Sequence, residues 1–285
     1  MILTVEQTLD RLLRRTCPLF AKGGPRDSLK SPPQVGSAVL FRFGQCSLLL
    51  TANHVRWDEE GCERELLIRS PGKAEDSTTF NSLKRPETPW RVKLPDYRDA
   101  DIVCIPMSEN LADSVGEMCE FVEPDDIGHP DDEIHGCGSR FLLIGFPNSS
   151  NKQAVIDPST GRARKGWGNT AFFAEPQHRL PDDFVARDGQ SSASHFALEG
   201  NTKMRPFVGG SICHAPKLNG MSGGGVWKLQ IDPRTQLVER CALVGIFIKQ
   251  DSWRGKIVLT SVCVEWAIDP KNWWHGDITD FAHGQ

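Results

Sequence analysis

The 285-residue sequence has no apolar stretch near the ~20 residues that a membrane-spanning helix requires. It also has no basic stripe with interleaved aromatic residues, so nucleic acid is not expected as a partner. The first residues, Met1-Ile-Leu-Thr-Val-Glu-Gln, lack the basic end and apolar core of a secretory signal. These absences predict a cytoplasmic protein that has no contact with a membrane.

The chain has nine cysteines, an odd number. Complete disulfide pairing within one chain is therefore impossible. Cys104 and Cys263 lie inside apolar runs, where cysteine behaves as a small buried hydrophobe. This usage is typical of a protein in a reducing compartment.

Composition excludes disorder along the whole chain, because 39% of the residues are hydrophobic and 25% are charged. This is enough apolar material for a sizeable core. The 26 glycines and 19 prolines suit many short strands joined by turns. The net charge of -4 bears on solubility and does not discriminate between folds.

Short apolar segments separated by glycine, proline, asparagine or aspartate dominate the chain. The expected strands are residues 36–43, 46–51, 65–68, 91–94, 102–105, 141–144, 154–156, 225–229, 243–248 and 257–260. Helices are expected only near the two ends, over residues 3–15 and 264–268. Because the strands do not alternate with helices, the pattern predicts an all-β fold of antiparallel barrels or sandwiches. Residues 108–135 are expected to be a connection, and residues 148–212 to carry long loops.

A glycine-rich segment, Gly220-Met-Ser-Gly-Gly-Gly, is the first candidate for a catalytic motif. A nucleophilic serine needs an exposed hydroxyl and nearby backbone N–H groups that hold a developing oxyanion. Glycine allows the sharp turn and the close approach of a substrate carbonyl. Taken alone, the segment fits a flexible turn equally well.

Two further segments supply a base and a carboxylate. In Leu49-Leu-Thr-Ala-Asn-His-Val, an apolar strand ends directly in His54. In Asp101-Ile-Val-Cys-Ile-Pro, a carboxylate stands at the start of an apolar strand. Such a carboxylate can orient a histidine and stabilise its imidazolium form. Each segment alone is more simply explained by a structural histidine or a strand-flanking aspartate.

Together, in the order His, Asp, Ser, the three segments resemble trypsin-like (chymotrypsin-fold) serine peptidases, especially a bacterial intracellular or stress-type branch. Leu50-Thr-Ala-Asn-His54 resembles the family's Leu-Thr-Ala-Ala-His, and Asp101-Ile-Val resembles its Asp-Ile-Ala. Asn219-Gly-Met-Ser222-Gly-Gly resembles its Gly-Asp-Ser-Gly-Gly. The resemblance covers roughly residues 34–266 and is poor over 150–210.

The resemblance implies two six-stranded antiparallel β-barrels with short terminal helices. The N-terminal helix and linker would occupy residues 1–30. The first barrel, with His54 and Asp101, would occupy residues 31–120. The second barrel, with Ser222, a C-terminal helix and a tail, would occupy residues 121–285.

The resemblance also implies a mechanism, in which Ser222 attacks a peptide carbonyl while His54 takes its proton and Asp101 orients the imidazole. The N–H groups of Gly220 and Ser222 would form the oxyanion hole. Activity would fall at acid pH, because a protonated His54 cannot accept the proton. No cofactor or metal is expected, and the partners would be a peptide or protein substrate and a regulatory protein.

One departure from the family concerns activation. Met221 stands where zymogen-activated members carry an aspartate that pairs with a freed N-terminus. Activation by that salt bridge is therefore not available, and the oxyanion loop must be preformed or ordered by something else. Val55 stands where secreted members have a cysteine, which agrees with a reducing compartment.

By the same resemblance, two segments should border the substrate pocket. The residues concerned are Pro216, Lys217, Asn219, Ile248, Lys249, Gln250 and Ile257. Pro216 stands where trypsin-type enzymes hold an aspartate, so a basic preference is not expected. Ile257 replaces a frequent glycine and indicates a shallow pocket, and the backbone of residues 248–250 should pair with the substrate as an added strand.

Three alternatives to a peptidase are an esterase, an inactive binding module and a metal site. The segment around Ser222 also matches the G-x-S-x-G elbow of α/β-hydrolase esterases, which need a helix after the serine and β-α alternation. A catalytically inactive binding module on the trypsin fold would keep the barrels without turnover. A metal site could draw on Cys119, His129, His135 and Cys137, but their spacing fits no zinc pattern.

Overall fold

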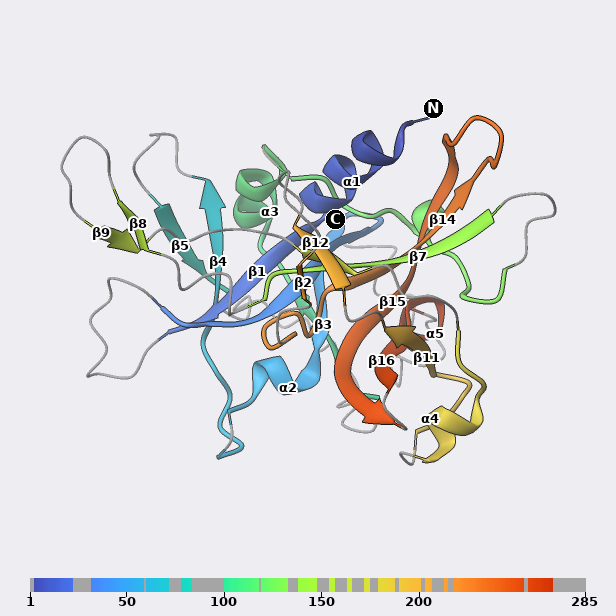
Figure 1. The fold of residues 1–285 in the computed structure, drawn as a ribbon. Coiled ribbons are helices and arrows are strands. Elements are labelled where there is room, and N and C mark those ends of the chain that lie inside the picture. Colours follow the sequence, from blue (N-terminus) through green and yellow to red (C-terminus); the bar gives the residue numbers. More distant parts are fainter. Residues whose placement is uncertain are drawn as a thin grey trace.

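A computed structural model describes the chain in segments. They are residues 3–22, 32–58, 60–71, 78–83, 100–117, 119–132, 138–147, 154–156, 163–165, 172–174, 179–187, 190–200, 203–206, 213–214, 218–253 and 256–268. Among these residues the structure is mostly β, with two antiparallel sheets and a few short helices (Figure 1). The prediction of an all-β fold is confirmed at this level.

The first sheet has six strands. Their order is β5 (Thr78–Ser82), β4 (Leu66–Pro71), β1 (Thr16–Ala21), β2 (Gln34–Phe43), β3 (Cys46–Ala52) and β6 (Ile102–Pro106). The expected hairpin at residues 36–51 is present as β2 and β3, in which Val39 faces Leu50. Every pairing in this sheet is antiparallel.

The second sheet has eight strands. Their order is β11 (His195–Gly200), β16 (Lys256–Cys263), β15 (Val238–Trp253), β14 (Gly225–Ile231), β7 (Gly138–Gly145), β10 (Phe172–Ala174), β12 (Lys203–Pro206) and β13 (Cys213–His214). A separate hairpin consists of β8 (Ala154–Ile156) and β9 (Ala163–Lys165). Within the described segments, the two end strands of each sheet do not pair with each other. The sheets are therefore open, and the prediction of two closed six-stranded barrels is not confirmed.

Five α-helices accompany the strands in the described part of the chain. They are α1 (Val5–Arg14), α2 (Asn53–Arg56), α3 (Glu109–Gly116), α4 (Asp183–Arg187) and α5 (Val264–Ile268), and a short 3-10 helix, η1, spans Pro124–Asp126. In Figure 1, α1 and α3 lie above β1 and β2, and α2 lies at the lower end of β3. No helix of the described residues is long and apolar enough to cross a membrane.

Both terminal helices were predicted. The prediction that helices occur only at the two ends is wrong, because α2, α3 and α4 lie between them. Helix α1 begins after Thr4, whose hydroxyl accepts the Gln7 N–H while the Gln7 side chain accepts the Thr4 N–H. This reciprocal cap satisfies two N–H groups that helix geometry leaves unpaired. Helix α3 lies inside the predicted connection, capped by Ser108 and held by Leu111, Ala112 and Val115 in the core.

The largest core joins the two sheets. It includes Leu49 and Leu50 of the first sheet and Leu142, Trp227 and Ile246 of the second, all at most 2% exposed. A second core lies within the eight-stranded sheet and contains Met221, and a third lies beside α4. The sheets therefore share their main hydrophobic core, and the loops near their contact are fixed from both sides.

Candidate active site

His54 and Asp101 come together because strands β3 and β6 are antiparallel neighbours. Ala52, the last residue of β3, faces Ile102, the first residue of β6. His54 follows the end of β3 by two residues, and Asp101 directly precedes β6. The side chains therefore project beyond the same edge of the sheet, although they are far apart in sequence.

The Asp101 carboxylate binds His54 through two hydrogen bonds. Its Oδ2 lies 2.7 Å from His54 Nδ1, and its Oδ1 accepts the His54 backbone N–H at 2.9 Å. The His54 side chain is 49% exposed and the Asp101 side chain 26% exposed, so the carboxylate is the more covered of the two. Because a carboxylate can only accept, Nδ1 carries a proton, and in the neutral ring the lone pair stands on Nε2.

The backbone of Asp101 is held in the left-handed region, with φ of 52°. Aspartate is one of the few residues other than glycine that tolerate this conformation. The Asp101 carbonyl accepts the Asn53 N–H at 3.0 Å, which ties the same turn to the start of α2. A conformation of this kind costs about 1–3 kcal/mol and persists where neighbouring contacts over-determine it.

The loop of Ser222 turns sharply between Leu218 and β14. Gly223 has φ of +88°, and a Cβ on it would lie 1.9 Å from the Ser37 carbonyl oxygen and 2.2 Å from Thr51 Oγ1. The site therefore needs glycine at this position for both conformation and space. Thr51 belongs to β3, so the serine loop packs directly on the strand that leads to His54.

The carbonyl groups of this loop are fixed by the first sheet, through residues that sequence reasoning missed. Ser37 N–H donates to the Ser222 carbonyl at 2.8 Å, and Ser37 Oγ donates to the Gly220 carbonyl at 2.9 Å. The same Oγ accepts the Phe146 N–H at 2.9 Å. Gln34 Nε2 also approaches the Gly220 carbonyl, at 3.4 Å, and bonds the Phe146 carbonyl. The one signal in the sequence is that Ser37 and Gln34 are polar residues in or beside an otherwise apolar strand.

Met221 orders the loop from the other side. Its side chain is fully buried in the second core with Leu143 and Leu218. Its N–H donates to the Leu218 carbonyl at 2.9 Å, and its carbonyl accepts the Gly224 N–H at 2.8 Å. Apolar burial of Met221 thus anchors the loop at this position.

The backbone of Ser222 and the residue after His54 lie on either side of Gly36. A Cβ on Gly36 would lie 2.6 Å from a Val55 methyl and 3.1 Å from the Ser222 carbonyl oxygen. Val55 directly follows His54, so Gly36 separates the two loops by the width of one missing side chain. The loop of Ser222 therefore packs against the strand and turn that carry His54, which itself contacts Asp101.

The Ser222 hydroxyl itself donates to the Ile248 carbonyl at 3.2 Å. Ile248 is the extra residue of a bulge in β15, since Phe247 faces Ser261 while Lys249 already faces Thr260. Its carbonyl therefore points away from the ladder and toward the serine. Among the described residues Ser222 Oγ makes no hydrogen bond to His54, so the hydroxyl must leave the Ile248 carbonyl before His54 can accept its proton.

The predicted oxyanion donors stand on the same loop. Gly220 has φ of +91°, and its carbonyl is held by Ser37 and Gln34 as described above. No acceptor within the described residues is recorded for the N–H groups of Gly220 and Ser222. The oxyanion role of these two N–H groups stays a prediction.

The residues predicted to border a substrate pocket divide into three groups. Pro216 and Lys217 lie outside the described residues. The Ile248 side chain is buried in the main core, whereas Asn219 and Gln250 are exposed and Lys249 forms an ion pair with Asp251 at 3.3 Å. Ile257 packs on Gly200 of β11, where a Cβ would meet it at 2.7 Å.

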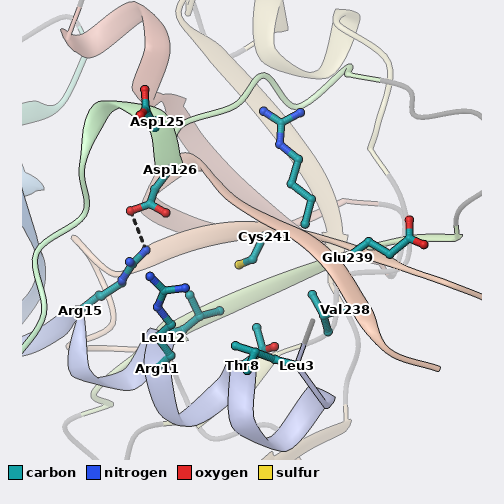
Figure 2. A pocket seen from close by; sticks show the side chains of 11 residues that line it. Leu3, Thr8, Arg11, Leu12, Arg15, Asp125, Asp126, Val238, Glu239 and Cys241 are labelled. Carbon is teal, nitrogen blue, oxygen red and sulfur yellow. Dashed lines mark ion pairs between the residues drawn. The ribbon is translucent and has the colours of Figure 1, made fainter. Parts of the chain in front are cut away.

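A cavity of about 250 Å³ lies elsewhere, between α1, η1 and the start of β15 (Figure 2). Arg15 spans it and pairs with Asp126 at 3.0 Å. Leu3, Leu12 and Cys241 contribute to its wall. None of its lining residues belongs to the loops of His54, Asp101 or Ser222.

The described residues place only part of the cysteine and metal candidates. Seven cysteines are free thiols, and burial raises the pKa of Cys104 well above the usual value and also raises the pKa of Cys263. Of the metal candidates, His135 and Cys137 lie outside the described residues, and His129 Nδ1 accepts the Asp131 N–H at 3.2 Å.

The order of elements around Ser222 excludes the esterase alternative. The loop leads directly into strand β14 and not into a helix, and the sheets contain antiparallel pairings throughout. An α/β-hydrolase elbow requires a strand–turn–helix unit on a mainly parallel sheet. The match of the glycine pattern to that elbow is therefore coincidental.

No family model matches the chain, and no curated protein matches it. One similar solved structure is AL20, a thermostable serine protease from an extremophilic microorganism, with 12% identity, a TM-score of 0.43 and coverage of 89% of this chain and 92% of that chain. Another belongs to work on the coupled folding and binding of the intrinsically disordered Sesbania mosaic virus VPg protein, with 12% identity, a TM-score of 0.40 and coverage of 89% and 88%. At such low TM-scores neither structure says what this chain does.

Proposed function

We propose that this chain is a trypsin-like serine endopeptidase in which Ser222 is the nucleophile, His54 the general base and Asp101 the residue that orients His54. The observation that carries the proposal is the 2.7 Å contact of Asp101 Oδ2 with His54 Nδ1, beside a serine loop fixed to the same strands. In this proposal the protein acts in the cytoplasm of a bacterium.

The chemistry is acyl transfer. Ser222 Oγ attacks the peptide carbonyl as His54 Nε2 takes its proton, and His54 then protonates the leaving amine. Water repeats the sequence and releases the acyl group. The N–H groups of Gly220 and Ser222 would hold the oxyanion, and each such donor typically contributes about 3–4 kcal/mol to lowering the barrier.

The substrate would bind as an extended strand beside β15. The carbonyl of Ile248 lies off the β15–β16 ladder and can accept an N–H from such a strand. Of the following residues, Gln250 is exposed and available to contact the substrate. Pro216, Lys217, Asn219 and Ile257 would border the side-chain pocket, with a preference other than for basic side chains.

A second candidate is a latent peptidase that a regulatory protein switches on. The observation that favours it is the hydrogen bond from Ser222 Oγ to the Ile248 carbonyl, since it turns the hydroxyl away from its base. A catalytically inactive binding module is the limiting case of this candidate. The experiment below separates the three.

The test is labelling of the purified protein with a fluorophosphonate, which reacts only with an activated serine, followed by mass spectrometry of the labelled peptide. The variants are Ser222→Ala and Asp101→Asn, with Ser252→Ala on exposed β15 as a matched serine control. We expect labelling of Ser222 in the wild type and in Ser252→Ala, and no labelling in Ser222→Ala. Asp101→Asn should be labelled about 10⁴-fold more slowly than the wild type.

Each remaining outcome has a separate meaning. Labelling that appears only when a cell lysate is added would support the latent enzyme. Folded protein that is never labelled would overturn the peptidase and leave the binding module. Labelling of Ser222→Ala at the wild-type rate would show that another nucleophile reacts and would rule out the assignment.

A further inference from the structure

His195 is a buried histidine that the proposed mechanism does not use. It begins β11 in the second sheet and is 2% exposed. Its backbone is fixed by the pairing of β11 with β16, where it faces Val262, and by its N–H, which donates to the Ser191 carbonyl at 2.9 Å. A buried polar side chain needs hydrogen-bond partners, and those of His195 lead to the catalytic carboxylate.

Both ring nitrogens of His195 have partners. Nε2 lies 3.1 Å from the Ala100 carbonyl, and Nδ1 lies 2.8 Å from Ser194 Oγ. A carbonyl can only accept, so Nε2 carries the proton, and in the neutral ring Nδ1 can only accept, which directs the Ser194 hydroxyl to Nδ1 rather than to the Ser191 carbonyl that lies 3.2 Å from the same Oγ. Burial lowers the pKa of His195, which agrees with the neutral form. The charges that face the ring are the Asp101 carboxylate and the Lys249 ammonium.

The hydrogen bond from His195 to the Ala100 carbonyl connects the second sheet to the turn of Asp101. Ala100 directly precedes Asp101, whose backbone stands in the left-handed region. On its other side, Asp101 is fixed by the N–H groups of Asn53 and His54. The peptide between Ala100 and Asp101 has its carbonyl held by His195, so rotation of that peptide would also turn the carboxylate.

We propose that His195 is a positioning residue for the catalytic dyad, because its Nε2–H donates to the Ala100 carbonyl and thereby fixes the Asp101 carboxylate on His54 Nδ1. This inference rests on the proposed function as far as turnover is concerned. Its geometric part, the effect on the Asp101–His54 hydrogen bond, does not depend on whether Ser222 is active. The second sheet would thus control the orientation of a dyad that belongs entirely to the first.

The test compares three variants of the full chain. His195→Gln keeps an amide N–H that can reach the Ala100 carbonyl, and His195→Leu removes the donor at similar volume. Leu198→Ala is the matched control, since Leu198 is fully buried in the same strand and belongs to the second core. Urea unfolding measures the stability of each variant, so that only folded protein is compared.

Two readouts separate positioning from a merely structural role. One is the split of kcat and KM for a peptide or activated ester. The other is the low-field ¹H NMR signal of the proton between His54 Nδ1 and Asp101, assigned by its absence from His54→Ala. His195→Leu should lower kcat by about 10²-fold, the cost of a small misplacement, leave KM nearly unchanged and lose the signal. His195→Gln should keep the signal and most of kcat, and Leu198→Ala should keep both.

Several results would overturn the inference. They are a folded His195→Leu with wild-type kcat and signal, a His195→Gln that behaves like His195→Leu, or an equal kcat loss in Leu198→Ala. If His195→Leu does not fold, Ser194→Ala removes the partner of Nδ1 and should weaken the signal; an unchanged signal would count against the proposal.

The NMR readout also distinguishes the two proposals. A wild type that turns over no substrate but shows the signal, with loss in His195→Leu, would refute the peptidase and keep the role of His195. Absence of the signal from the wild type would refute the dyad and with it the role of His195.

Discussion

Replacing Ser37 with alanine removes the hydroxyl that joins three parts of the site. Ser37 Oγ donates to the Gly220 carbonyl and accepts the Phe146 N–H, both at 2.9 Å, while its backbone N–H holds the Ser222 carbonyl. The side chain is fully buried, so water cannot replace it without entering the core. We therefore expect Ser37→Ala to lower both stability and activity.

The expected loss of stability follows from the two hydrogen bonds. A hydrogen bond lost to the Gly220 carbonyl costs about 1 kcal/mol, and a buried Phe146 N–H left unpaired costs about 1–3 kcal/mol more. Ser37→Ala should therefore reduce the free energy of unfolding by about 2–4 kcal/mol. Because the Gly220 peptide loses its strongest tether, Ser222 labelling should slow by at least about 10-fold, less than the 10²–10³-fold effect of deleting an oxyanion donor outright.

Urea unfolding and the rate of fluorophosphonate labelling measure the two effects on the same preparation. Ser261→Ala is the matched control, because Ser261 is equally buried and its hydroxyl has no hydrogen-bond partner within the structure. It should be neutral or slightly stabilising. A Ser37→Ala protein that unfolds at the same urea concentration as Ser261→Ala and is labelled at the wild-type rate would refute the role given to Ser37.

Three further predictions concern the same loop and its surroundings. Gly223→Ala should lower the free energy of unfolding in urea by at least about 3 kcal/mol, since its Cβ would meet the Ser37 carbonyl at 1.9 Å. The control is Gly44→Ala, at a position with φ of +58° and open space, which should cost about 1–2 kcal/mol. Equal costs would contradict the clash. Met221→Asp should lose several kcal/mol by burying a charge, and Met221→Leu less than about 1.5 kcal/mol, with comparable losses counting against an apolar anchor. Burial lowers the pKa of His195 below its ordinary 6.5, so the unfolded chain binds more protons just below that pH and the free energy of unfolding should fall as pH drops, by at most about 1.4 kcal/mol per pH unit. His195→Gln should flatten this dependence, and an unchanged slope in pH-dependent urea titrations would refute it.

Much of the site could be predicted because its information is local. Each of His54, Asp101 and Ser222 stands where an apolar strand begins or ends or where glycines cluster, and such positions are visible in a single sequence. The hairpin of β2 and β3 and the strands β6, β14, β15 and β16 followed from the same alternation of apolar runs and breakers. The expected strand at residues 91–94 and the tail beyond residue 268 lie outside the described residues.

The missed features depend on contacts between distant segments. Strand β1 was not predicted, because its short Thr16–Ala21 run lies between a helix and glycine breakers and becomes a strand by pairing with β2 and β4. Helix α3 was missed because its polar face resembles a loop, and only burial of its apolar residues reveals its amphipathic character. Ser37 and His195 carry no sequence signature of function, since their importance comes from which carbonyl each one reaches.

Those two residues give the site a reciprocal arrangement. Ser37 of the first sheet holds the carbonyls of the nucleophile loop that precedes β14 in the second sheet. His195 of the second sheet holds the carbonyl next to Asp101, which precedes β6 in the first. Each sheet therefore fixes the catalytic turn of the other, and neither could orient its own reactive group if the shared core between them loosened. Under the proposed function, the geometry of the three residues would depend on how the two sheets dock, so substitutions in the shared core should change Ser222 labelling as well as stability.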